Sequence, residues 1–139
     1  MNMKRILIGG LAGGVAYFML GWLCYGILFT DLMASGAGSA TGVYKSDEEM
    51  DFISLIIGNF ALGFMLSVIF SWSKHYGLMS GLFMGAVIGI LYCTGFDFIM
   101  YGTSNLMTLN GTLIDILVGT INATLAGGVT GWSMGMVKD

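Results

Sequence analysis

Four polar side chains fall inside long apolar stretches of the sequence, where a polar group needs either a partner or a function. Asn59 and Asn122 are amides, and Asp97 and Asp115 are carboxylic acids. Intramembrane amides usually bond across helices for roughly 1 kcal/mol each, whereas an intramembrane acid is protonated, paired or exposed to water. These four residues are therefore the first candidates for a solute or ion pathway.

We interpret these polar groups mainly as structural. Asp97 falls in the last turn of its expected helix, where the negative end of the helix dipole disfavours an anion, and Lys45 is the cation expected on the same side. The sequence predicts that Asp97 is a superficial acid at the outer interface. If a residue has a role beyond packing, Asp97 is the first choice and Asp115 the second. For Asn59 and Asn122 we predict hydrogen bonds between helices.

The other reactive residues do not form a catalytic set. Cys24 and Cys93 lie far apart in apolar runs and make neither a C-x-x-C pair nor a metal knuckle, although both are expected in the outer halves of parallel spans. Single buried cysteines are usually apolar fillers. The lone His75 falls in a short loop and is expected to be solvated. We therefore predict no catalytic residue, no cofactor and no metal, with a thiol enzyme as a minor alternative.

Two short motifs resemble helix caps. Ser46-x-x-Glu49 stands in an acidic cluster that could hold a divalent cation, but its spacing is that of a capping box. Thr112-x-x-Asp115 has the same spacing and is expected to begin the last helix, with Asp115 in the first turn. The segment 36–42 before the acidic cluster has the composition of a flexible linker.

The composition defines the class of protein in which these residues stand. The chain has 139 residues, of which 56% are hydrophobic and 9% are charged, against roughly 25% charged in a soluble domain. Its mean hydropathy is +0.86, and it has no proline. We therefore expect an integral membrane protein with one domain, residues 1–139. Five Lys and Arg in all and a net charge of -3 leave no basic surface for nucleic acid.

Four stretches are long enough to cross a bilayer, which requires roughly 20 apolar residues per helix. Strands of a membrane barrel would be about ten residues long with alternating polarity, and these stretches are twice that length. The sequence predicts an all-α, four-helix transmembrane bundle with spans at about 6–29, 52–72, 78–100 and 112–136. Because the loop 73–77 is very short, the second and third spans are expected to be antiparallel neighbours.

The cations predict the orientation, because Lys and Arg near span ends stay on the cytoplasmic side. Lys4, Arg5, Lys74 and Lys138 fall on one side of the four-span arrangement, and Lys45 falls on the other. Both termini are therefore expected in the cytoplasm. The first span is too long for the apolar region of a signal peptide, so we expect it to be retained.

Glycines at four-residue spacing predict where the helices touch, because small residues let helix backbones approach closely in lipid. Two long stripes of this kind are present, and the helix-packing residues are Gly81, Gly85, Gly89, Gly127, Gly131 and Gly135. A weak echo between the first and third spans suggests two related hairpins. The stripes themselves could serve either the internal bundle or a partner subunit.

The order of several motifs resembles a bacterial family of small four-helix membrane proteins that is classified as a domain of unknown function. The shared features are Gly21-Trp22, Tyr25 and Leu28-Phe29 at the end of the first span, Gly81-Leu-x-x-Gly85 in the third, and Asp115 and Gly131-Trp132 in the last. The resemblance covers most of the chain and implies a multi-pass protein of the bacterial inner membrane. It implies no activity.

Two functions remain open from the sequence. The first is a non-catalytic accessory subunit or homo-oligomeric component, which would pack in the lipid against other integral membrane subunits or copies of itself. The glycine stripes and short loops favour it. The alternative is a small solute or ion transporter or channel with Asp97 and Asp115 on its pathway. Both acids are expected toward the outer edge, whereas transporters usually place an ionisable group near the midplane.

Overall fold

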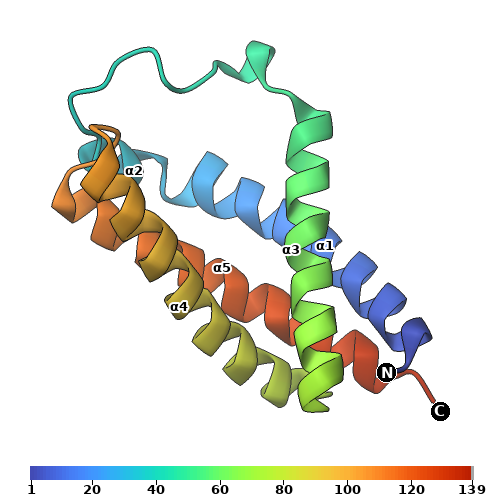
Figure 1. The fold of residues 1–139 in the computed structure, drawn as a ribbon. Coiled ribbons are helices and arrows are strands. Elements are labelled where there is room, and N and C mark those ends of the chain that lie inside the picture. The colour runs from blue at the N-terminus through green and yellow to red at the C-terminus, as the bar shows by residue number, and fades with distance from the viewer. Residues whose placement is uncertain (139) are drawn as a thin grey trace.

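The computed structural model describes residues 1–138 and is helical (Figure 1). Helix α1 (Met3–Leu23) continues through a π-helical turn, Cys24–Leu28, and is followed by α2 (Thr30–Ser35), a 3-10 turn (Asp47–Glu49), α3 (Phe52–Ser73), α4 (Leu78–Thr103) and α5 (Leu109–Gly135). Within the described residues, four helices are long and apolar enough to cross a membrane. The four-span prediction is confirmed in this sense.

The N-terminal cap of α5 differs from the prediction. Thr108 is the N-cap, and its hydroxyl accepts a hydrogen bond of 3.1 Å from the backbone N–H of Gly111. Thr112 lies inside the helix, fully buried, and donates its hydroxyl proton to the carbonyl of Thr108. The predicted cap at Thr112 is therefore wrong, because a second threonine one turn earlier provides the same chemistry and gives the helix four more residues.

The beginning of α3 uses two consecutive caps. The predicted capping box of Ser46 and Glu49 is present, but it closes only the short 3-10 turn. Asp51 caps α3 itself, because its carboxylate accepts hydrogen bonds from the backbone N–H groups of Ile53 and Ser54. Acidic residues are favourable at this position, since the helix N-terminus carries a partial positive charge.

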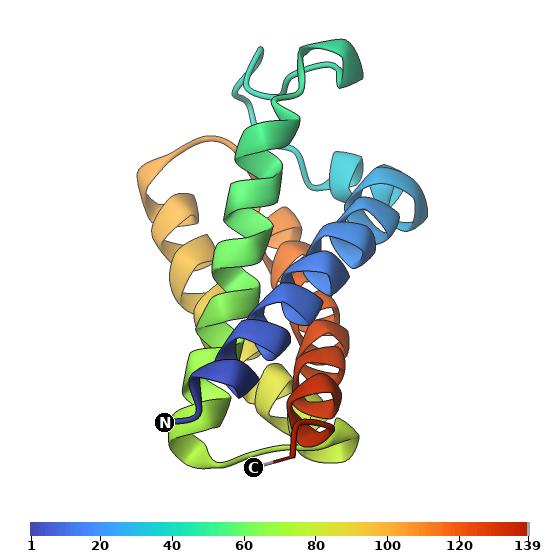
Figure 2. The same ribbon diagram turned by 90° about the vertical axis from the view of Figure 1, so that its right-hand side faces the viewer.

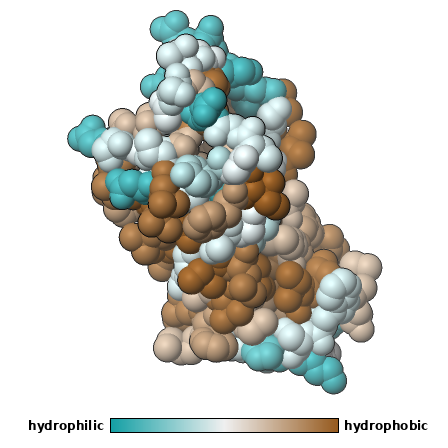
Figure 3. All heavy atoms as spheres, turned by 60° about the vertical axis from the view of Figure 1, so that its left-hand side comes forward, coloured by the Kyte–Doolittle hydropathy of each residue, from teal (hydrophilic) through white to brown (hydrophobic). Residues whose placement is uncertain are grey.

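The two ends of the bundle differ as the cation pattern predicts. Both termini lie at the same end as the α3–α4 turn, and the longer loops lie at the other end (Figure 2). We call these the inner and outer ends. Apolar residues cover the middle of the molecule and hydrophilic residues gather at its ends (Figure 3). The chain thus has the form of a membrane-spanning bundle, while the cytoplasmic side of the inner end remains a prediction.

Helices α4 and α5 pack backbone against backbone through the two predicted glycine stripes. A β-carbon on Gly127 would lie 2.7 Å from the Cα of Gly85 and 2.6 Å from the carbonyl oxygen of Gly81. Gly131 meets Gly81 in the same manner, and the N–H of Gly77 donates a 2.7 Å hydrogen bond to the carbonyl of Gly131. Both stripes are therefore used within one chain.

Helices α1 and α3 form the second close pair. Gly13 and Gly14 of α1 face Gly63 of α3, with room for no β-carbon between them, and Gly10 lies under the ring of Phe64. Helix α1 also packs against α5, which joins the two pairs. The expected pairing into two helical hairpins is thereby observed, and the relation between the hairpins as repeats stays a prediction.

The short loop predicted that helices α3 and α4 are packed neighbours. They are not packed against each other along their length. They meet at their inner ends and diverge toward the outer ends (Figure 1). The loop fixes only their antiparallel direction, whereas the glycine grooves of α1 and α5 offer closer contacts than the two helices offer each other. Gly58 on α3 and Gly95 on α4 face open space. The divergence leaves room between the outer halves of the helices.

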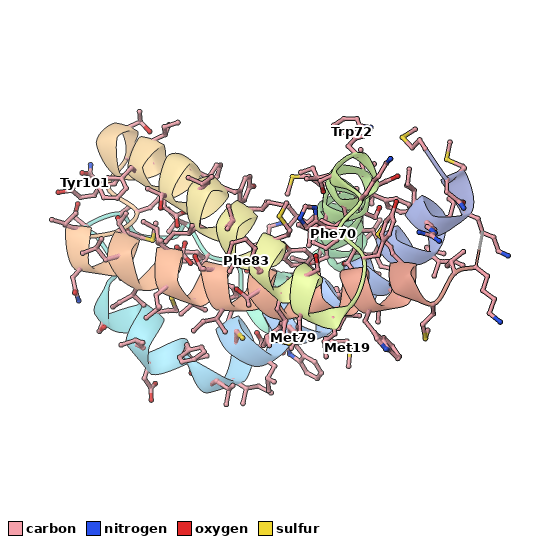
Figure 4. The ribbon with its side chains drawn as sticks, turned by 90° about the horizontal axis from the view of Figure 1, so that it is seen from below. Met19, Phe70, Trp72, Met79, Phe83 and Tyr101 are labelled. Atoms are coloured by element: carbon pink, nitrogen blue, oxygen red, sulfur yellow. The ribbon has the colours of Figure 1, made fainter. Side chains whose placement is uncertain are left out.

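The inner half of the bundle is densely packed. Leu66 and Phe70 on α3 and Met134 on α5 are fully buried. Seen from below, Phe70 points between the helices, whereas Trp72, two residues later, projects away from them (Figure 4). Arg5 ties the inner end together, because its guanidinium lies 4.5 Å from the ring centre of Tyr76 and donates a 2.9 Å hydrogen bond to the carbonyl of Val137.

The outer loops hold each other through their backbones. The N–H of Gly38 donates to the carbonyl of Leu106, and the N–H of Thr108 donates to that of Gly36, both at 2.9 Å. Gly36 also touches the backbone of Gly111 with no room for a β-carbon. The first half of the predicted flexible linker is therefore fixed in place, and its glycines serve close approach between segments.

Candidate functional site: a cavity in the outer half of the bundle

A cavity of about 800 Å³ lies between the outer halves of α1, α3, α4 and α5. This volume is within the range of about 300–1,000 Å³ that is typical of small-molecule sites. Its walls are mainly apolar and aromatic, and Asp47 and Met50 of the outer loop stand at its rim. The cavity exists because α3 and α4 diverge toward the outer end.

The inner end of the cavity is closed by the packed core. Tyr17, Met65 and Ala123 are among the last residues that line it toward the inner side. One turn further on, Leu66, Phe70 and Ala126 are fully buried, and the glycine contacts hold the helix backbones together. The cavity is therefore one-sided, accessible from the outer half and shut toward the inner end.

Both candidate amides line this cavity. Asn122 is 13 residues from each end of α5 and thus at the midpoint of the helix. Its exposed fraction is 7%, and its side-chain oxygen finds no hydrogen-bond partner in residues 1–138. Asn59 instead donates its amide N–H to the carbonyl of Leu55 on its own helix, at 2.8 Å. The predicted hydrogen bonds from these amides to other helices are thus not what the described residues form.

The two amides come together across α1. A β-carbon on Gly21 would lie 3.5 Å from Nδ2 of Asn122 and 3.8 Å from Oδ1 of Asn59. Gly21 therefore leaves the space in which side chains from α3 and α5 approach each other. This places two amide groups on one wall of the cavity, near the middle of the bundle.

Asp97 is buried, with an exposed fraction of 5%. The prediction of a superficial acid is wrong, because α4 continues to Thr103 and places Asp97 six residues, or about 9 Å, from its end. Asp115 lies six residues from the start of α5 at the same outer level. The two carboxylates interact electrostatically. The charged neighbour of Asp97 is thus a second acid, while Lys45 stands exposed on the outer loop.

Tyr25 and Cys93 connect the acid pair to the cavity. The hydroxyl of Tyr25 lies near the carboxylate of Asp115, and the two groups interact electrostatically. A β-carbon on Gly119 would lie 3.3 Å from the Tyr25 oxygen and 2.6 Å from the sulfur of Cys93, so both groups lie over this glycine. Tyr25, Cys93 and Gly119 all line the cavity. The acid pair lies one helical turn beyond them, since Asp97 follows Cys93 by four residues.

The two cysteines form no disulfide within the described residues. Cys24 and Cys93 are both free thiols, and Cys24 is buried with an exposed fraction of 3%. Cys93 lines the cavity and Cys24 does not. The expected placement in the outer halves of two spans is observed, while their side chains face different surroundings.

Tyr25 also separates the cavity from a second one. A smaller cavity of about 450 Å³ lies under the outer loop and is lined by Tyr25, Met33 and Tyr44, among others. Tyr25 belongs to the π-helical turn, in which the N–H of Phe29 donates to the carbonyl of Cys24. Such single turns are frequent at functional sites. The aromatic ring thus forms a partition between an outer vestibule and the cavity in the bundle.

The sequence reasoning found the polar members of this site and missed the residues that join them. Tyr25 and Gly119 carried no separate signal, since one aromatic and one glycine among many have no distinctive spacing. Tyr25 entered only through the family resemblance.

The arrangement can bind a small molecule in an apolar chamber with two amides on its wall, and an acid pair lies one helical turn beyond its outer side. No protein-family model, curated protein or solved structure matches the chain, so the family resemblance stays a prediction.

Proposed function

We propose that the chain is a membrane transporter or channel for a small solute, which enters the bundle from the outer end and passes beside Asp97 and Asp115. The observation that carries the proposal is the one-sided cavity, with Asn122 at the helix midpoint and the oxygen of its side chain without a hydrogen-bond partner in the described residues. Transporters place their binding sites near the bilayer midplane. A polar group that is buried there without a partner costs free energy unless a ligand supplies one.

The glycine stripes favoured the accessory subunit when only the sequence was considered. Both stripes are now accounted for by the contact between α4 and α5, so they no longer favour a partner protein. The accessory or oligomeric function and the absence of enzymatic activity stay predictions. Lipids remain the expected surroundings of the exposed apolar side chains, and we propose the bacterial inner membrane with cytoplasmic termini as the location.

The closed inner half of the bundle implies that transport requires a change of conformation. A solute in the cavity reaches the inner side only if the contacts of Phe70 and Met134, or those of the glycine interfaces, open while the outer end closes. Such alternating access is the usual mechanism of small transporters. The acid pair is suited to couple this change to a proton or cation, since two neighbouring carboxylates hold charge poorly unless one is neutralised. Tyr25, which interacts electrostatically with Asp115 and lines both cavities, would transmit the change to the outer cavity.

Accessibility of the native thiol Cys93 tests this proposal without knowledge of the solute. In a Cys24→Ala variant, Cys93 is the sole cysteine. We expect a membrane-impermeant methanethiosulfonate reagent to label it when added to the outer side of proteoliposomes, and more slowly when added to the inner side. The matched control is Cys93→Ala, in which the buried Cys24 should stay unlabelled from both sides.

The two sides of the membrane give distinct results. Labelling of Cys93 from the outer side alone, over hours and with the acids intact, would show a binding chamber without transport and overturn the proposal. Absence of labelling from both sides would also overturn it. In the Asp115→Asn variant we expect labelling from the inner side to change at least tenfold while labelling from the outer side persists, because the substitution perturbs the change between states.

A further inference from the structure

Unpaired hydrogen-bond acceptors stand on the polar wall of the cavity. The amide nitrogen of Asn59 is engaged with the carbonyl of Leu55 at 2.8 Å, which leaves its oxygen for another donor. The oxygen of Asn122 has no partner in the part of the chain that the structure describes. A half-turn of a terminal amide exchanges its oxygen and nitrogen, so the oxygen of Asn122 can face the cavity. A ligand on this wall can therefore donate hydrogen bonds to the two amide oxygens.

The charged residues at the rim of the cavity and beside its α4 and α5 walls are acidic. Asp47 stands at its rim, and Asp97 and Asp115 lie one turn beyond Cys93 and Gly119. Among the described residues that line the cavity there is no Lys, Arg or His. A carboxylate or phosphate would enter without a counter-charge, which is costly in a low-dielectric interior. A cation is favoured by the same field.

Aromatic rings form much of the remaining wall. Tyr17, Trp22 and Tyr92 line the cavity from α1 and α4, and Tyr92 stacks on Phe96 with ring centres 6.2 Å apart. The faces of aromatic rings attract cations, most strongly when both partners are shielded from water. They also provide an apolar surface for a hydrocarbon body. The wall thus suits a molecule that is cationic at one end and apolar elsewhere.

We infer that the cavity binds a lipophilic amine, with its ammonium group at the oxygens of Asn59 and Asn122 and its apolar body among the aromatic rings. This inference rests on the proposed function and names its substrate class. A primary ammonium offers only donors, which is what the unpaired amide oxygens require. An alcohol of the same shape supplies one donor and no charge, and a carboxylate supplies no donor.

The fluorescence of Trp22 can report the binding of a ligand in the cavity. It lines the cavity, whereas Trp72 and Trp132 lie near the inner ends of α3 and α5. In a Trp72→Phe, Trp132→Phe protein, Trp22 is the only tryptophan. The protein is placed in phosphatidylcholine nanodiscs and titrated with 4-phenylbutylamine, 4-phenylbutan-1-ol and 4-phenylbutyrate, which share one apolar body. Empty nanodiscs correct for partition into lipid.

We expect saturable binding of the amine, with the alcohol about tenfold weaker and the carboxylate weaker still, because hydrogen bonds to a charged donor are stronger. Asn122→Leu should weaken amine binding about tenfold and leave the alcohol less affected. The matched control is Asn110→Leu, on the same helix but exposed at the outer end, which should change nothing. Equal affinities for amine and alcohol, or tighter binding of the carboxylate, would overturn the inference.

The outcomes separate the two proposals. The comparison of three ligands uses a protein with all four candidate polar residues intact, so it stands even if Asn122→Leu fails to fold. Labelling of Cys93 from both sides, combined with no preference for the amine, would retain transport and reject the substrate class. Selective amine binding with labelling from the outer side alone would retain the site and reject transport.

Discussion

Replacement of Gly127 by alanine tests whether the contact between α4 and α5 holds the bundle together. The added β-carbon would lie 2.6 Å from the carbonyl oxygen of Gly81 and 2.7 Å from the Cα of Gly85, where ordinary contacts begin at 3.4 Å. Both neighbours are backbone atoms, so the helices must part by most of an ångström. Overpacking of this kind costs about 1–3 kcal/mol.

The same substitution has an opposite effect where no neighbour is present. Gly95 lies on α4 with nothing within 4 Å of its added β-carbon, and alanine there is expected to stabilise the helix by up to about 1 kcal/mol through its higher helix propensity. Alanine at position 127 has the same gain in helix propensity, so the difference between the two variants measures the cost of the clash. We therefore expect Gly127→Ala to be less stable than Gly95→Ala by about 1–3 kcal/mol.

Unfolding by sodium dodecyl sulfate in mixed micelles, followed by circular dichroism, measures this difference. The midpoint of the Gly127→Ala variant should fall below that of the Gly95→Ala variant, with the slope of the transition unchanged. If the two variants unfold at the same detergent fraction, the close contact of the two glycine stripes is not the main support of the α4–α5 pair, and the stripes become available again for a partner protein.

Three further predictions concern the caps and turns. Thr108→Val removes the cap of α5 and should destabilise the protein by about 1 kcal/mol in the same detergent assay. Lys74 ends α3 at φ 55°, and Lys74→Gly should stabilise by about 1 kcal/mol, because the left-handed region is unfavourable for a side chain. The hydroxyl and N–H of Ser54 hold the pKa of Asp51 below its usual range, so the stabilisation from this cap is complete above about pH 4 and is lost as the pH falls through the lower folded pKa. Amide exchange in the first turn of α3 checks this, and Asp51→Asn should remove the pH dependence.

The spans could be predicted from the sequence because apolar length is a property of one segment at a time. The glycine stripes could be recognised for the same reason, since their spacing along one helix suffices. Their partners could not, because Gly81 and Gly127 become neighbours only through the packing of two helices. The divergence of α3 from α4 had no signal either, as the short loop constrains only their inner ends.

The depth of the polar residues shows how a small error at a helix end changes a functional interpretation. The sequence predicted that the third span ends near residue 100 and that the fourth begins near residue 112, whereas α4 runs to Thr103 and α5 begins at Leu109. Three residues correspond to about 4.5 Å along a helix. This moves Asp97 out of the last turn and Asn122 to the midpoint of its helix. The outer position of the acids was the reason against a transporter, and for Asp97 this reason no longer applies.

The distribution of the glycines also explains why the cavity lies in the outer half. Glycines at which two long helices meet backbone to backbone, such as Gly63, Gly81 and Gly131, hold the middle and inner parts of these helices together. Gly58 and Gly95, in the outer halves, face open space and draw nothing together. In lipid, where hydrophobic attraction between helices is weak, helices that lack such contacts are free to separate. The sequence thus packs one end of the bundle closely and leaves a chamber at the other, and any passage of a solute must open either the glycine interfaces or the contacts of Phe70 and Met134 that close the inner end.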